Sequence, residues 1–165
     1  MPVGRFGPVD GGKSMTAWEW DDSLSMHIEE IDEQHKHAFE LLGEVRQAMR
    51  ERMERRICIK RMEMLRDYLS THFAVEERLM HEYGYPRLIE HKRQHCDTMS
   101  TMNLICERMK NERAIITFET FDDMAVRMHD HVVRYDQRYA PFVRQSGERR
   151  LPPPIRPIEP PQINA

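Results

Sequence analysis

Two pairs of potential metal ligands stand at helical spacing in the middle of this sequence. His72 and Glu76 are four residues apart, and His91 and His95 repeat that spacing. Side chains four residues apart lie on the same face of an α-helix, about 40° from each other. Imidazole nitrogens bind iron, copper, nickel and zinc, and carboxylate oxygens can bridge two such ions. The two pairs therefore predict a metal site, provided that they lie at the same height on neighbouring helices.

The heights can be compared across the turn at Gly84-Tyr85-Pro86, which predicts the end of one helix and the start of the next. At about 1.5 Å per residue, the first pair lies about 14 and 20 Å from this turn, and the second pair about 9 and 15 Å. The levels overlap, so the four side chains can converge.

The helical face that carries His72 and Glu76 also carries apolar residues, which indicates that it points into a core. They are Leu65, Leu69, Phe73 and Leu79. A buried histidine or glutamate without a partner costs several kcal/mol, and a bound metal removes that cost. Glu77, one residue further along, turns away by about 100° and is expected to be solvated. A hydrogen-bonded polar network is the alternative, but it would need only one or two such groups.

In two further pairs of histidines, His35 with His37 and His129 with His131, the members are two positions apart. Residues at that spacing point to nearly opposite sides of a helix, so only one member of each pair can face the core. Asp136 follows the second pair. Five inward histidines and two carboxylates are too many for one tetrahedral zinc ion, and two ions fit better. A di-iron centre in a bundle core is the interpretation with the most support.

Four segments with helical periodicity must position these residues. They cover about residues 30–53, 57–83, 86–109 and 118–139, with almost no internal glycine or proline. Short connections make consecutive helices antiparallel neighbours. The predicted fold is therefore all-α, an up-down-up-down antiparallel four-helix bundle with an N-terminal arm and a proline-rich C-terminal tail.

Both ends of the chain lack this periodicity. Residues 1–17 contain glycine and proline and are predicted to form a flexible leader before the bundle, which is assigned to residues 18–140. Residues 141–165 are predicted to form an extended tail, because six of the ten prolines lie within 151–165 and proline cannot continue a helix. The tail is interpreted as passive, with docking to a protein partner as the alternative.

Composition excludes several other classes of protein. The 165 residues are enough for one domain, and 32% are charged against 39% hydrophobic. A formal net charge of -3 gives no general basic field to attract nucleic acid. No apolar run approaches the ~20 residues of a membrane helix, so a soluble protein in the cytoplasm is expected. The three cysteines predict buried thiols rather than a disulfide framework.

Several runs of residues together resemble the hemerythrin family. They are Ile31-Asp32-Glu33-Gln34-His35-Lys36, His72-Phe73-Ala74-Val75-Glu76-Glu77, Leu79-Met80 with Gly84-Tyr85-Pro86, His91-Lys92-Arg93-Gln94-His95, and His131 with Asp136. Trp18 and Trp20 are similar to the tryptophan-containing arm before the first helix of bacterial members. The resemblance covers about residues 18–139. It implies a non-haem di-iron protein that binds dioxygen reversibly.

The resemblance also implies a role for each ligand. One iron would be held by His91, His95 and His131, and the other by His35 and His72. Glu76 and Asp136 would bridge the two irons together with a solvent-derived oxygen, which leaves one open position on the second iron. His131 and Asp136 are five residues apart, about 140° out of line on a regular helix, so a local widening of the helix is expected.

This sequence departs from the family pattern at one position near the second iron. Three residues after His35 the family usually has leucine, whereas this chain has Ala38. Ala38 is expected beside the open iron, together with Met128 and Val132 around His131. The smaller residue opens the apolar wall of the oxygen pocket unless the flexible Met128 side chain fills the gap.

Oxygen carriage, storage or delivery is the predicted function, with dioxygen as the partner. Sensing or scavenging of oxygen, nitric oxide or peroxide through the same centre is the alternative. An enzyme is not expected, because the sequence offers no evident substrate pocket or dedicated acid and base. A site rich in histidine is also expected to favour binding over O–O cleavage, since imidazole donates less negative charge than carboxylate.

Overall fold

The computed structural model describes residues 19–111 and 117–147, and every regular element within these ranges is helical. In chain order they are the 3-10 turn η1 (Asp22–Leu24), α1 (Glu29–Arg50), α2 (Arg55–Glu82), α3 (Leu88–Lys110), α4 (Phe118–His131), the π-helical segment η2 (Val132–Asp136) and α5 (Gln137–Gly147). The prediction of an all-α fold is confirmed. The predicted leader, Trp18 and residues 148–165 of the predicted tail lie outside the described residues.

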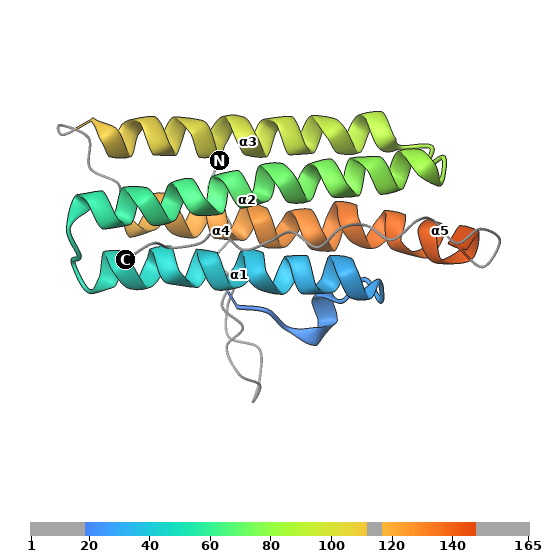
Figure 1. Ribbon diagram of the computed structural model, residues 1–165, viewed down its shortest axis with the longest axis horizontal. Coiled ribbons are helices and arrows are strands. Elements are labelled where there is room, and N and C mark those ends of the chain that lie inside the picture. The colour runs from blue at the N-terminus through green and yellow to red at the C-terminus, as the bar shows by residue number, and fades with distance from the viewer. Residues whose placement is uncertain (1–18, 112–116, 148–165) are drawn as a thin grey trace, which may run out of the picture.

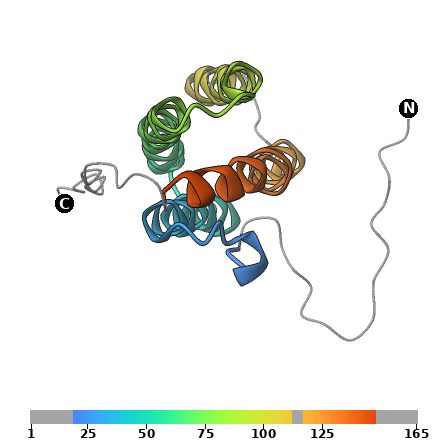
Figure 2. The same cartoon turned by 90° about the vertical axis from the view of Figure 1, so that its right-hand side faces the viewer.

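The long helices lie side by side as a bundle (Figure 1). α1 packs on α2 and α2 packs on α3, while α4 contacts both α1 and α3. The colour gradient in Figure 1 shows that successive long helices run in alternating directions. Viewed end-on, α1, α2, α3 and α4 surround a common interior (Figure 2). Side chains from all of them can therefore meet at one level of the bundle.

The end of α2 is set by a glycine in the left-handed region. Gly84 has a φ of 67°, which glycine adopts without the steric cost that a Cβ would bring. Its N–H donates to the carbonyl of His81 at 3.1 Å, and the N–H of Tyr85 donates to the carbonyl of Met80 at 2.8 Å. This is the Schellman arrangement, which satisfies the last carbonyls of a helix. The predicted helix stop is confirmed, and it fixes the register of α3 against α2.

Apolar side chains form two clusters, one toward each end of the bundle. Ala38 and Leu42 belong to the larger cluster, and Ile31 and Met80 to the smaller one. On α1, His35 lies between Ile31 and Ala38 and is buried with them. Seven buried histidines and carboxylates thus form a polar layer with apolar packing on both sides. They are His35, His72, Glu76, His91, His95, His131 and Asp136.

The predicted widening between His131 and Asp136 is present as η2. In this segment the backbone is π-helical, so its hydrogen bonds span five residues instead of four. Five residues then complete about one turn, whereas on a regular α-helix they would overshoot by about 140°. Asp136 is fully buried and His131 nearly so. The wider turn therefore brings both side chains into the same interior layer.

The helix continues past Pro141, so the prediction that it ends before this residue is wrong. α5 contains Pro141 and runs to Gly147, and residues 141–147 are helical rather than extended. The ring of Phe142 lies 5.6 Å from that of Tyr85, and Val143 is buried in the smaller apolar cluster. Burial of these side chains offsets the backbone hydrogen bond that proline cannot make.

The segment before α1 is held by contacts to α1 and α5. The carboxylate of Asp32 accepts a hydrogen bond from the backbone N–H of Met26 at 2.6 Å. The guanidinium of Arg144 donates to the carbonyl of Met26 at 2.5 Å. This places the Trp20 ring 6.4 Å from the ring of His35. The segment therefore covers the side of the bundle where α1 contributes to the polar layer.

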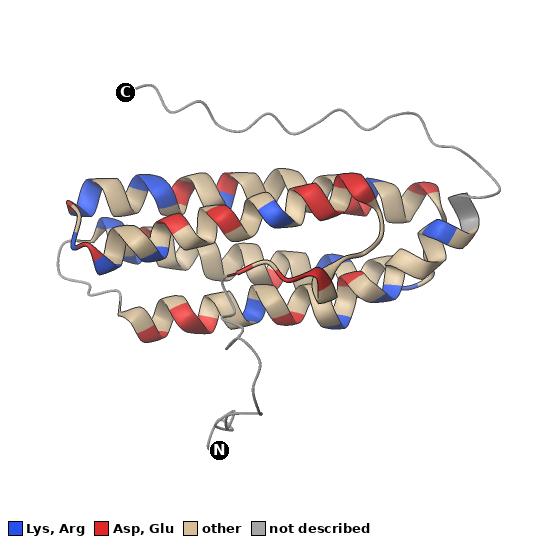
Figure 3. Ribbon diagram, turned by 90° about the horizontal axis from the view of Figure 1, so that it is seen from below, with Lys and Arg blue, Asp and Glu red and all other residues tan. Residues whose placement is uncertain are grey.

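Among the described residues, no helix is long and apolar enough to cross a membrane. Basic and acidic residues are interspersed along the helices (Figure 3). Cys58 and Cys106 are buried free thiols as predicted, but Cys96 is exposed. The prediction is wrong for Cys96 because this residue follows the inward His95 and is turned about 100° away from it.

Candidate metal centre

The structure brings together all seven side chains that the sequence analysis singled out as metal ligands. They form two adjoining groups, one of Glu76, His91, His95, His131 and Asp136 and one of His35, His72 and Glu76. Within each group the ligand atoms lie within 4.8 Å of one another. Every side chain is buried, with at most 7% exposed. Because Glu76 belongs to both groups, the two potential metal positions are neighbours.

Asp136 lies between histidines that come from different helices. Its Oδ1 atom is 3.1 Å from the Nε2 atoms of both His91 and His131. Its Oδ2 atom is 3.4 Å from Nε2 of His35. The two oxygens of one carboxylate therefore face histidines of both groups, which is the arrangement of a bridging ligand.

Glu76 occupies the corresponding place on the other side of the layer. Its Oε2 atom is 3.1 Å from Nε2 of His95 and 3.7 Å from Nε2 of His72. The hydroxyl of Tyr139 donates to its Oε1 atom at 2.6 Å. Burial and the negative charges of Glu76 and Asp136 raise the pKa of Tyr139 well above its usual value. Tyr139 therefore stays protonated and holds the orientation of the Glu76 carboxylate.

The atoms that face one another in this layer have no hydrogen-bond partner among the described residues. They are Nε2 of His35, His91, His95 and His131, Oε2 of Glu76, and both carboxylate oxygens of Asp136. An unsatisfied buried polar atom costs about 1–3 kcal/mol, and native cores contain few of them. Metal ions bonded to these nitrogens and oxygens would satisfy all of them together. The set of donors therefore fits a pair of transition-metal ions.

Two side chains behind the histidines orient their rings. Oε1 of Gln34 lies 2.9 Å from Nδ1 of His72, and Oε1 of Glu77 lies 3.0 Å from Nδ1 of His95. An acceptor at Nδ1 keeps the proton on that nitrogen and leaves Nε2 free to bind metal. Glu77 also pairs with Lys92 at 2.9 Å and is half-buried. The prediction that Glu77 is solvated is wrong, because α3 packs against the flank of α2 from which it projects.

Aromatic rings fix two of the histidines by stacking. The ring of Phe73 lies almost parallel to that of His95, with centroids 3.9 Å apart. The ring of Tyr135 lies 5.5 Å from that of His131, at an angle of 24°. Both histidines are thus restrained in ring plane as well as in position, which prepares the site for metal before an ion arrives.

Burial and the two carboxylates shift the pKa values of the histidines in opposite directions. Burial lowers the pKa of His72 to about 4, although the charge of Glu76 opposes the shift. Burial also disfavours protonation of His35 and His131, but the nearby carboxylate of Asp136 outweighs it and raises the pKa of both. Despite its burial, Asp136 has a pKa well below the usual value, because these histidines stabilise its charge. The carboxylate is therefore ionised and available to a metal.

A small apolar cavity of about 20 Å³ adjoins the His35 and His72 group. Its walls include Ala38, Met128 and Val132, the three residues predicted to form an oxygen pocket, with Phe39, Leu69 and Phe73 beside them. Met128 does not fill the space left by the alanine completely, since the cavity persists next to both residues. Its volume is enough for about one molecule of the size of water.

The remaining histidines lie outside the centre. His37 turns outward, where its Nδ1 atom is 3.0 Å from Glu40, and His129 has 26% of its side chain exposed. His27 and His81 are exposed. The structure places His35 and His131 in the polar layer, and their neighbours His37 and His129 outside it. The helical period alone did not decide which member of each pair faces the core.

Known proteins are similar in sequence to this chain over much of its length. The family described as the hemerythrin HHE cation binding domain matches residues 26–143. Bacteriohemerythrin of Stenotrophomonas maltophilia is 40% identical over 76 residues, which is 46% of this chain and 49% of that protein. The matched stretch thus spans about half the length of that relative.

Two other relatives extend the comparison. Bacteriohemerythrin of Pseudomonas aeruginosa is 29% identical over 135 residues, 77% of this chain and 82% of that protein. Myohemerythrin of Theromyzon tessulatum is 27% identical over 85 residues, 52% of this chain and 65% of that protein. The comparison with solved structures found no match. The family match covers every residue of the polar layer, and the chain belongs to the hemerythrin family.

Proposed function

We propose that the polar layer holds two iron ions and that the protein binds dioxygen reversibly, for carriage, storage or delivery. The observation that carries this proposal is the unequal number of histidines in the two groups. One group offers His91, His95 and His131, whereas the other offers His35 and His72. With Glu76 and Asp136 shared between them, the second metal position has one protein ligand fewer. That position is the one beside the apolar cavity.

The two irons, when bound, supply the electrons that reversible binding of dioxygen requires. The chain itself positions the ions and controls what reaches them. Ala38, Met128 and Val132 present apolar walls toward the incompletely ligated position, and such walls exclude water and anions from a bound gas molecule. Tyr139 keeps Glu76 in place through its 2.6 Å hydrogen bond.

A binding protein is favoured over an enzyme by the contents of the site. Five imidazoles and two carboxylates donate less negative charge than a carboxylate-rich set, so they stabilise high-valent iron less well. The cavity of about 20 Å³ leaves no room for a larger substrate. Sensing or scavenging of oxygen, nitric oxide or peroxide is the second candidate, and the small residue at Ala38 favours it because a less sealed pocket loses its gas ligand to side reactions more readily.

Optical spectroscopy of the iron-loaded ferrous protein tests the proposal. We expect about two irons per chain and an absorption band that appears with dioxygen and disappears when the gas is removed. Rapid conversion to the ferric form that is not reversed by removing oxygen would instead support sensing or scavenging. An iron-loaded chain whose spectrum does not respond to dioxygen would contradict both functions.

Leucine in place of Ala38 is expected to slow autoxidation of the oxygen-bound protein, by about three- to tenfold. The added carbons fill the cavity beside Met128 and keep water and anions from the bound gas. Stopped-flow measurement of the autoxidation rate checks this. Ala74→Leu makes the same chemical change on the exposed face of α2 and should leave the rate unchanged. An equal or faster rate in Ala38→Leu would show that the native pocket is already sealed.

A further inference from the structure

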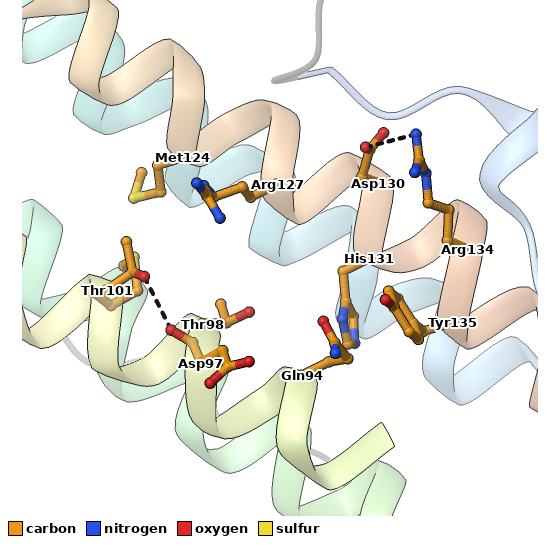
Figure 4. A pocket seen from close by; sticks show the side chains of 11 residues that line it. Gln94, Asp97, Thr98, Thr101, Met124, Arg127, Asp130, His131, Arg134 and Tyr135 are labelled. Carbon is orange, nitrogen blue, oxygen red and sulfur yellow. Dashed lines mark hydrogen bonds and ion pairs between the residues drawn. The ribbon is translucent and has the colours of Figure 1, made fainter. Parts of the chain in front are cut away.

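A polar cleft opens between α3 and α4 on the flank of the metal centre. Its volume is about 230 Å³, and its floor and walls come from α3, α4 and η2. Gln94, Asp97 and Thr98 lie along the α3 wall, opposite Arg127 and Arg134 (Figure 4). The cleft is more than ten times as large as the apolar cavity beside Ala38 and differs from it in being lined by charged and hydrogen-bonding groups.

The four charged residues of the cleft are not equally paired. Nη2 of Arg134 lies 3.2 Å from Oδ2 of Asp130, so these two charges largely neutralise each other. Arg127 forms no ion pair or hydrogen bond within the described part of the chain, and its guanidinium extends over the cleft (Figure 4). Asp97 adds one negative charge on the opposite wall but does not reach Arg127. Arg127 is therefore the cation that is left to receive a ligand.

Neutral hydrogen-bonding groups surround that cation. The hydroxyl of Thr101 already donates to the carbonyl of Asp97 at 3.0 Å. For the hydroxyl of Thr98 and the amide of Gln94, by contrast, the described residues provide no hydrogen-bond partner. Both groups can donate to an oxygen atom, and both lie on the wall that faces Arg127.

The inner end of the cleft reaches the metal centre. Thr98 and His131 line the cleft and also line the apolar cavity beside Ala38. A molecule bound in the cleft therefore lies beside one of the histidines of the centre.

We propose that this cleft is a binding site for a small, planar, singly charged oxyanion with three oxygens, such as nitrate. Arg127 receives it, because a planar guanidinium matches two oxygens of a planar anion. Thr98 and Gln94 donate to the remaining oxygen from the opposite wall. Asp97 limits the charge that the site accepts, since its repulsion grows with each further negative charge on the ligand. The occupied site is distinct from the cavity proposed for dioxygen and does not depend on which metal the centre holds.

Titration of the full chain with sodium nitrate, followed by amide NMR at constant ionic strength, tests the proposal. Zinc in the centre keeps the protein diamagnetic, so that signals near the cleft remain visible. Saturable shifts are expected at Thr98, Thr101 and Arg127. Arg127→Gln should weaken binding about fivefold or more, and Asp97→Asn should strengthen it about two- to threefold, because they remove the attractive and the repulsive charge.

Arg50→Gln is the matched control, because it removes the same charge from an exposed residue at the end of α1. It should leave nitrate affinity unchanged. Shifts spread over the whole surface, or equal weakening by Arg127→Gln and Arg50→Gln, would show general charge screening and overturn the proposal. Should Arg127→Gln fold poorly, the opposite effect of Asp97→Asn still decides the question. None of these outcomes depends on oxygen binding, so the cleft and the proposed function can fail separately.

Discussion

Alanine in place of His95 is expected to leave a helical protein that retains one iron per chain or less, instead of about two. His95 supplies an Nε2 atom 3.1 Å from Glu76, and its ring is held by both Phe73 and Glu77. Removal of this ligand exposes one ion to exchange and leaves the buried carboxylate incompletely neutralised. Iron analysis after gel filtration, with circular dichroism as a check on folding, measures the effect.

The chain offers matched controls for this experiment. His129→Ala and His37→Ala remove histidines that lie outside the polar layer, and both variants should keep the iron content of the native protein. His131→Ala should lose iron to the same extent as His95→Ala. Loss of iron from His129→Ala together with its retention in His131→Ala would overturn the assignment of ligands.

Removal of the metal is expected to destabilise the fold and to reverse the pH dependence of its stability. A tightly bound metal contributes about 4 kcal/mol when its concentration is 1,000 times the dissociation constant, so chelation should lower the melting temperature by roughly 10 °C. The metal-loaded protein should lose stability as the pH falls, because protons compete for the imidazole nitrogens. The metal-free protein should show the opposite trend above pH 6.5.

His35 and His131 account for the fall in stability that we expect of the metal-free protein as the pH rises. Their pKa values are raised in the folded state, chiefly because Asp136 outweighs the effect of burial. Protonation therefore stabilises the fold below the unfolded pKa of about 6.5, and this stabilisation is lost as the pH rises through the folded pKa values. The lowered pKa of His72, about 4, acts in the opposite direction only below pH 6.5. Melting temperatures between pH 6.5 and 8.5 isolate the first effect.

Asp136→Asn sharpens this measurement. In the metal-free state the variant should flatten the fall in stability with rising pH, because the charge that raises the two histidine pKa values is gone. Asp130→Asn makes the same substitution on a half-exposed residue that pairs with Arg134 and should keep the native slope. A metal-free protein whose stability rises with pH over this range would contradict the explanation.

The helical period was enough to predict most of the metal centre. His72, Glu76, His91 and His95 could be placed from their four-residue spacing and from the stop at Gly84, since both depend only on local geometry. Asp136 could not be placed in this way, because its position depends on the backbone of η2. Asp136 could be counted among the candidate ligands from the sequence, but only the resemblance to a family implied its role as a bridge.

The residues that support the centre were harder to find. Gln34 and Glu77 contact histidines on other helices, and nothing in their own helical neighbourhood indicates such a contact. Tyr139 is eight residues beyond His131, which on a regular helix would turn it about 80° away from the centre. Pro141 misled the prediction for a related reason, since its cost is local whereas the burial of Phe142 and Val143 depends on distant partners.

The extra residue of η2 also sets the rotational phase of everything that follows it. α5 is rotated relative to a continuous α-helix, and this rotation is what turns Tyr139, Ala140 and Val143 toward the interior. A regular α-helix of the same length over Val132–Asp136 would rotate that whole face by about 100°. It would separate Asp136 from His131 and at the same time expose the apolar side of α5. The chain between His131 and Tyr139 should therefore tolerate only those substitutions that keep the π-helical backbone of η2.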